Sequence, residues 1–187
     1  LSLERSIFDE LTCYIMQNSK SILINANILS KIDVSLGFAD IAIKNNYCLP
    51  SIHKKQEISL VASRHPVIEK LLSVEDSFIP NDINLNSDIK QIAVITGPNM
   101  AGKSTFLRQV ALISILAQIG SYVPANKANL CIIDKVYTRV GASDNLSEGE
   151  STFLVEMNET ANILNNATSR SLIILDEIGR GTSTYDG

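Results

Sequence analysis

The chain has 187 residues, with no tryptophan, three cysteines and two histidines. Cys13, Cys48 and Cys131 are odd in number, far apart and outside any C-x-x-C pair. This spacing fits neither a disulfide framework nor a zinc site, because those need even sets or close pairs of cysteines. The cysteines therefore indicate buried thiols in a reducing compartment, and we expect a cytoplasmic protein.

Other features are absent as well. No segment holds the roughly 18 unbroken apolar residues of a membrane span, and the N-terminus has no signal-peptide pattern, so we expect no membrane partner. The net charge of −4 is not the footprint of a nucleic-acid surface, so any strongly basic DNA-binding surface should lie mostly elsewhere. The chain begins at Leu1 and ends at Gly187 in a turn-like sequence, so we treat it as a fragment.

The first 46 residues or so have a helical pattern, with no proline and no glycine before Gly37. The pattern predicts a long helix that packs along other helices through one seam. Two shorter helices that meet near Asp33 or Gly37 are the alternative, and Pro50 ends the helical region. The seam consists of apolar residues at a heptad step: Leu1, Phe8, Ile15, Ile22, Leu29, Leu36 and Ile43.

The rest of the chain alternates between short apolar runs and helical patterns, as in an α/β domain. A helix is expected after residue 150, with Phe153, Met157, Ala161 and Leu164 on one face. Pro66 and Pro80 mark turns. The predicted strands are 58–61 (an edge strand), 92–95, 130–133, 136–140 and 172–175.

Residues 97–104 fit the phosphate-loop pattern G-x-x-x-x-G-K-[ST]. They lie between the predicted buried parallel strand 92–95 and a predicted helix, 105–119, that Gly120 closes. In such a loop the backbone N–H groups surround phosphate oxygens at a helix N-terminus. Lys103 can then reach the β- and γ-phosphates, and the Ser104 hydroxyl can bind Mg²⁺. The pattern predicts binding of a nucleoside triphosphate.

Asp176 and Glu177 directly follow the predicted strand 172–175. In phosphate-loop ATPases the first carboxylate at such a strand end holds Mg²⁺, and the next polarises the water that attacks the γ-phosphate. Parallel strands bring the loop and the carboxylates to one edge of a sheet. The pair therefore favours hydrolysis by water over transfer of the phosphate to another substrate.

Residues 147–153 form a third candidate element, a turn of small residues that opens the predicted helix. Such a turn can bind an anion at the helix N-terminus. It can equally be an ordinary N-cap, in which Ser151 or Thr152 accepts hydrogen bonds from the first turn. The residues alone leave both interpretations open.

Four blocks in order, 96–105, 120–125, 149–157 and 176–187, resemble the MutS family of DNA mismatch-repair proteins, and residues 64–69 extend the resemblance. The family's ATPase domains are of the ABC type. The resemblance implies an α/β, P-loop nucleotide-binding domain over 49–187, with a mainly parallel sheet and flanking helices. Residues 1–48 are implied to be a helical arm, the end of the family's lever helices.

The resemblance also implies roles in binding ATP and Mg²⁺. Ser104 and Asp176 would serve the metal, and Glu177 would be the catalytic carboxylate, assisted by Lys103. Ser151 would reach the nucleotide of a partner subunit, and residues 181–184 would cross the dimer interface. The implied nucleotide-binding residues are Gly97, Pro98, Asn99, Met100, Ala101, Gly102, Lys103, Ser104 and Thr105, with Phe78 and Ile79 flanking the adenine.

The partners implied are a second copy of the protein, mismatched double-stranded DNA bound through other parts, and a MutL-type repair protein, near the nucleoid in a bacterium. The implied ATPase domain stops before the family's switch histidine, a role that neither His53 nor His65 takes, and before its C-terminal helix-turn-helix. We therefore expect weak or no ATPase activity from the fragment alone. The alternatives are a relative in recombination or ribosome rescue, a transporter-type ATPase subunit, and a non-catalytic dimerisation module.

Overall fold

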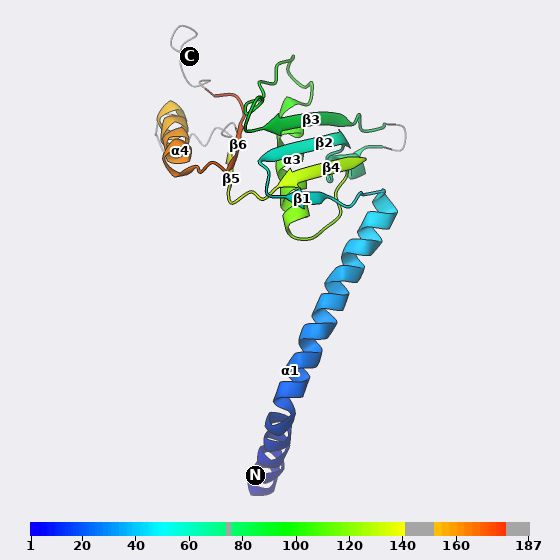
Figure 1. Cartoon of the computed structure of the whole chain (residues 1–187). Helices are drawn as coiled ribbons and strands as arrows, with labels where there is room; N and C mark the ends of the chain where they lie inside the picture. Colours follow the sequence, from blue (N-terminus) through cyan, green and yellow to red (C-terminus); the bar gives the residue numbers. More distant parts are fainter. Residues whose placement is uncertain (74–75, 141–151, 179–187) are drawn as a thin grey trace. The chain divides into compact units, whose positions relative to one another are not determined.

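The computed structural model describes residues 1–73, 76–140 and 152–178 (Figure 1). It divides into a helical unit, residues 1–44, and an α/β unit, residues 45–187.

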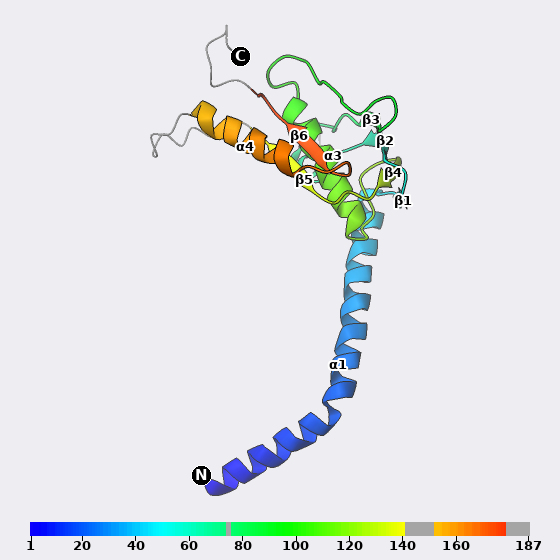
Figure 2. The ribbon, with the colours of Figure 1, turned by 60° about the vertical axis from the view of Figure 1, so that its left-hand side comes forward.

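The helical unit is one helix, α1 (Ser2–Asn45), which continues through Asp33 and Gly37. The long helix is therefore confirmed, and the alternative of two shorter helices is wrong. Figure 2 shows that α1 bends within its first half while it stays helical. Thr12 and Asn18 donate side-chain hydrogen bonds to the carbonyls of the residues four positions earlier, a kind of contact that bends helices.

Nearly all side chains of α1 are exposed, including every residue of the predicted seam. Among the described residues, α1 is also the one helix whose length and composition would suit a membrane span, with a mean hydropathy of 1.3 in its most apolar window. A single such helix is weak evidence of a membrane segment, because core helices of soluble proteins pass the same test.

The described part of the α/β unit contains two sheets. The first has four strands in the order β1 (Ser51–His53), β4 (Lys127–Cys131), β2 (Glu57–Ser63) and β3 (Asn81–Asn86). The second pairs β5 (Val136–Arg139) with β6 (Leu172–Leu175) in parallel. The helices of this unit are α2 (Ile68–Leu71), α3 (Lys103–Gln118) and α4 (Thr152–Asn166).

The predicted mainly parallel sheet is right for β5 and β6 but wrong for the four-stranded sheet. There β1 and β4 are parallel, whereas β2 runs antiparallel to both β4 and β3. Only residues 54–56 connect β1 to β2, so the two strands run in opposite directions. Because β4 lies between them, it can be parallel to only one of the two.

Two strand predictions need correction. Residues 58–61 were expected at a sheet edge, but β2 lies between β4 and β3, and its Ile58 and Leu60 are buried on the core side. Residues 92–95 form no strand, and Ile92 and Val94 are 79% and 84% exposed. No described strand pairs with this run, and an apolar run without a neighbour cannot form a buried parallel strand.

The predicted face of α4 is half right. Phe153 and Met157 are partly buried, but Ala161 and Leu164 are exposed. Ile163 is buried instead, and so is the charged Glu156, which a hydrophobic pattern leaves out.

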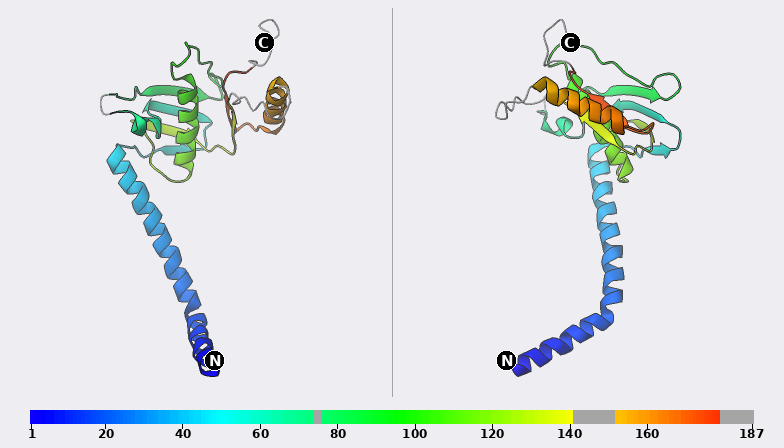
Figure 3. Two further views of the ribbon diagram at one scale, coloured as in Figure 1. Left: turned by 180° about the vertical axis from the view of Figure 1, so that it is seen from behind. Right: turned by 90° about the vertical axis from the view of Figure 1, so that its left-hand side faces the viewer.

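Helix α3 packs against both sheets (Figure 3). Its Val110 and Ile113 belong to one apolar cluster with Leu60 and Leu130 of the first sheet and with β6 of the second. Ile113 has no exposed surface at all. The same helix therefore determines where its own N-terminus, with Lys103, lies relative to β6.

The C-terminus of α3 has the glycine predicted for it. Gly120 has φ of 89°, its N–H donates to the carbonyl of Ala117, and the Ser121 N–H donates to that of Leu116. These two bonds form a Schellman motif, which needs a residue in the left-handed region.

The two glycines of these helices should respond to alanine in opposite ways. Gly120→Ala places a Cβ at positive φ and should destabilise the end of α3 by about 1–2 kcal/mol. Gly37→Ala, inside α1 and with open space around it, should stabilise that helix by about 0.5–1 kcal/mol. Hydrogen exchange in the full-length protein should become faster at residues 115–121 in the first variant and slower around residue 37 in the second. Slower exchange at 115–121 in Gly120→Ala would contradict the motif.

Candidate nucleotide-binding site

The predicted phosphate loop precedes α3 and turns sharply. Met100 and Gly102 have φ of 63° and 86°, so two of three consecutive residues are in the left-handed region. The Ala101 N–H donates to the carbonyl of Pro98 at 3.3 Å. A side chain at Gly102 would be strained at this φ, although no atom of the described residues crowds the position.

The ammonium of Lys103 lies over its own loop. Its Nζ donates to the carbonyl oxygens of Gly97 and Pro98, each at 2.8 Å. Gly102 is the N-cap of α3 and has no side chain to accept hydrogen bonds from the N–H groups of the first turn. The loop therefore combines a held positive charge with a helix N-terminus that favours anions.

The carboxylate pair lies beyond the end of β6. The Asp176 N–H donates to the carbonyl of Arg139 at 2.7 Å, which extends the parallel pairing by one residue. Asp176 is 8% exposed, whereas Glu177 is exposed and has φ of 54°. The backbone turn at Glu177 thus gives the two neighbouring carboxylates different environments, one buried and one open to solvent.

Contacts between α3 and β6 connect the loop to the carboxylates. Leu172 and Ile174 of β6 are buried in the same cluster as Val110 and Ile113 of α3. Figures 1 and 2 show the N-terminus of α3 and the end of β6 at the upper end of the α/β unit. The two predicted halves of the site thus lie on elements that pack together.

The donor set suits Mg²⁺ held mainly by phosphate and water. The described residues contain no cluster of three or more His, Cys, Asp or Glu side chains that could hold a metal ion. Mg²⁺ commonly takes one or two protein oxygens together with substrate phosphates. The half-buried Ser104 hydroxyl and the buried Asp176 carboxylate are oxygens of this kind.

The other predicted site residues lie before β3, in or next to the loop, or outside the described part of the chain. Phe78 is half-buried and Ile79 is 79% exposed, in a segment without helix or strand just before β3. Ser151 and residues 181–184 lie outside the described residues. Asn99 and Thr105 belong to the loop and to the first turn of α3, respectively.

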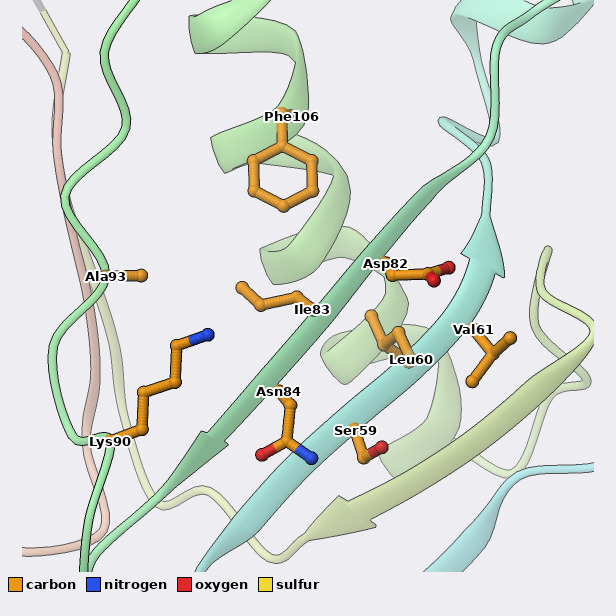
Figure 4. Close-up of a pocket in the computed structure, with 9 residues that line it drawn as sticks. All are labelled: Ser59, Leu60, Val61, Asp82, Ile83, Asn84, Lys90, Ala93 and Phe106. Carbon is orange, nitrogen blue, oxygen red and sulfur yellow. The ribbon is translucent and has the colours of Figure 1, made fainter.

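A hollow of about 420 Å³ opens over β2 and β3, and Figure 4 shows its lining. Asp82, Asn84 and Lys90 supply polar groups, and Phe106 and Ala93 supply apolar ones. None of the predicted site residues lines it, so this hollow is not the predicted nucleotide site.

Sequence reasoning missed Arg139, the last residue of β5. The residue is 6% exposed, and its Nε lies 3.0 Å from Oε2 of Glu159 on α4 without the alignment of a hydrogen bond. Its Nη1 donates to the carbonyl of Val140. Arg139 ends β5, and β5 pairs with β6, the strand that leads to Asp176. This position near the predicted carboxylates is the signal in the sequence that could have drawn attention to Arg139.

His65 is buried and holds the turn that follows it. It is 5% exposed, and its Nδ1 accepts hydrogen bonds from the N–H groups of Val67 and Ile68, each at 3.2 Å. This acceptor role requires an unprotonated Nδ1. Burial, followed by the charge of Arg108, lowers the pKa of His65 below 6.5.

The lowered pKa predicts a loss of stability in acid. Below about pH 6.5 the unfolded chain binds a proton at His65 that the folded chain does not. Proton binding therefore stabilises the unfolded state, and the free energy of unfolding falls. The stability that neutral His65 provides should be complete above pH 6.5 and decline as the pH falls towards the lower pKa of the folded state. Urea denaturation of the full-length protein on both sides of pH 6.5 should show this decline, and His65→Asn should reduce it. An equal decline in both proteins would assign the effect to other groups.

The glycine loop at a helix start and the acidic pair after a parallel strand place the chain in the class of α/β domains with a phosphate-loop signature. The family model described as MutS domain V matches residues 93–187, about half of the chain. The chain belongs to the MutS family, which confirms the resemblance noted in its sequence.

Similar proteins cover nearly the whole chain. It is 54% identical over 187 residues to the DNA mismatch repair protein MutS of Phocaeicola vulgatus, covering 100% of this chain and 22% of that protein. It is 61% identical over 166 residues to that of Cytophaga hutchinsonii, covering 89% of this chain and 19% of the relative. For Chlorobium chlorochromatii the identity is 54% over 187 residues, covering 100% and 21%. The chain thus spans about a fifth of the length of these relatives.

Proposed function

We propose that this chain is the ATP-binding and ATP-hydrolysing part of a DNA mismatch-recognition protein. The observation that carries the proposal is the phosphate loop at the start of α3, with the Lys103 ammonium held over it. The packing of α3 on β6, which leads to Asp176 and Glu177, supports hydrolysis as well as binding. The names of the MutS relatives support mismatch repair over transport.

The loop binds the triphosphate through its own donors. Phosphate oxygens accept hydrogen bonds from the loop and from the first N–H groups of α3, for which Gly102 provides no side-chain acceptor. The Lys103 ammonium exchanges the carbonyls of Gly97 and Pro98 for β- and γ-phosphate oxygens. The ammonium keeps the same number of hydrogen bonds in this exchange, and the new bonds are stronger because the phosphate oxygens are charged as well.

The two carboxylates divide the remaining work. Asp176, buried at the end of β6, and the Ser104 hydroxyl hold Mg²⁺, which supplies positive charge to the phosphates. Glu177, exposed at the backbone turn, orients the attacking water and accepts its proton. Phe78 and Ile79 flank the adenine, since an aromatic and an exposed apolar side chain suit a planar base.

The nucleotide site is shared between two copies of the full-length protein. Ser151, which precedes Thr152 in the sequence, contacts the nucleotide bound to the partner. The remaining parts of the full-length protein bind the mismatched DNA, and ATP binding is coupled to them and to a MutL-type partner. The full-length protein acts in the cytoplasm, with no membrane partner.

Binding and turnover should respond differently to two substitutions in the full-length protein. Lys103→Ala should weaken ATP binding by about a hundredfold or more, because charged hydrogen bonds to phosphate are lost. Glu177→Ala should leave binding intact and slow hydrolysis by about 10²–10⁴-fold. Fluorescent-nucleotide titration and steady-state phosphate release measure the two effects.

Lys90→Ala is the matched control, because Lys90 is exposed and lies outside the loop. It should leave both binding and turnover unchanged. Unaltered ATP affinity in Lys103→Ala would show that the loop assignment is wrong, and undiminished turnover in Glu177→Ala would remove Glu177 from the role of base.

Mixed dimers test the shared site. Ser151→Ala should lower hydrolysis in dimers, and Lys103→Ala should inactivate the site of its own subunit. When the two variants are mixed, the losses should be non-additive, because one composite site then carries both defects and the other carries neither. Tagged heterodimers isolated in two affinity steps give this measurement. Strictly additive loss would place Ser151 in the nucleotide site of its own subunit.

A further inference from the structure

A bulge in β2 turns one serine into the core. Ile58 and Leu60 face inward, so alternation along a strand would next place Ala62 inward and Ser63 outward. Instead the register with β3 shifts between Leu60 and Ser63, and Ala62 has φ of 47°. The Ala62 N–H donates to Oδ1 of Asp82 at 2.6 Å, which holds the bulge. Ser63 is left with no exposed surface.

The buried serine joins two other groups. Its hydroxyl donates to the carbonyl of Asn81 at 2.7 Å and accepts from Nε2 of Gln109, also at 2.7 Å. A carbonyl can only accept, so the serine proton must point to Asn81 and the glutamine must present its amide N–H. The network therefore determines the orientation of the Gln109 side chain.

Gln109 has no exposed surface, and its Oε1 has no hydrogen-bond partner in the described part of the chain. Burying an amide oxygen without a donor is costly, and an apolar side chain of similar size would avoid that cost. A glutamine at position 109 can donate a hydrogen bond to Ser63, whereas a methionine there cannot.

The network of Gln109, Ser63 and Asn81 joins two segments of the proposed nucleotide site. Gln109 lies on α3, six residues beyond Lys103, which is about 9 Å along the helix axis. Asn81 directly follows the segment 78–80, which contains Phe78 and Ile79. The relay Gln109–Ser63–Asn81 thus connects the phosphate-loop helix to the segment proposed to flank the base.

We propose that Gln109 is a positioning residue that sets the spacing between the phosphate loop and the base-flanking segment. The inference rests on the proposed function and extends it to the base. Gln109 touches neither phosphate nor base, and acts through Ser63 and the backbone of Asn81. Its loss should weaken recognition of the base and leave recognition of the phosphates unchanged.

The test compares two ligands that differ in the base. Full-length protein is titrated with ATP and with inorganic tripolyphosphate, both with Mg²⁺, in the wild type and in Gln109→Met. The Kd for ATP should rise about tenfold, the scale of one buried hydrogen bond, and the Kd for tripolyphosphate should change less than about twofold. Ser63→Ala breaks the same relay with a small side chain, and should reproduce the effect if Gln109→Met folds poorly.

Ser114→Ala is the matched control on the same helix. Ser114 is 2% exposed and donates to the carbonyl of Val110 at 2.8 Å. It therefore makes a buried hydrogen bond that is not part of the relay to Asn81. This variant should bind both ligands as the wild type does. The double variant with Gln109→Met and Ser63→Ala should be no worse than either single one, because both remove one relay.

Each other outcome has a definite meaning. Equal weakening of both ligands would show that Gln109 only stabilises the fold, and an unchanged Kd for ATP would show that the relay does not reach the base; either overturns the inference. Failure of the wild type to bind ATP, or unaltered ATP binding in Lys103→Ala, would overturn the proposed function itself.

Discussion

The burial of one face of α3 is the interaction on which the rest of the α/β unit depends. Ile113, with no exposed surface, lies in a cluster that includes both sheets, and burying such a side chain is worth about 1.5–3 kcal/mol. Because this helix begins at Lys103 and packs on β6, the same contacts that stabilise the core also place the phosphate loop relative to Asp176. A substitution that loosens the packing of α3 should therefore change both the stability of the unit and the geometry of the candidate site.

Features that depend on neighbouring residues could be predicted from the sequence. The helix after the glycine loop, its end at Gly120 and the strand 172–175 followed by Asp176 all follow from short-range rules about φ, capping and apolar runs. Local backbone preferences act within a few residues, so they can be predicted from the sequence of a short segment.

Features that depend on distant partners could not be predicted in this way. Residues 92–95 have the composition of a buried strand, yet no described strand pairs with them. The inward turn of Ser63 depends on a bulge that Asp82 holds from another strand, and the buried Glu156 breaks the apolar pattern of α4. Sheet order, bulges and buried polar groups are decided by contacts between segments, about which spacing says nothing.

Net charge illustrates the same distinction between local and global properties. A chain with a net charge of −4 is a poor general attractor for a polyanion such as ATP. Helix α3, however, contains no acidic residue, and it begins with a lysine whose ammonium two carbonyls hold over the loop. Salt screens exposed charges that lie more than about 8 Å away at physiological ionic strength, so charges on distant surfaces matter little at this helix N-terminus. Affinity for phosphate can therefore reside in one loop of an acidic chain, whereas a DNA-binding surface would need many positive charges over a large area, which a net charge of −4 does not indicate.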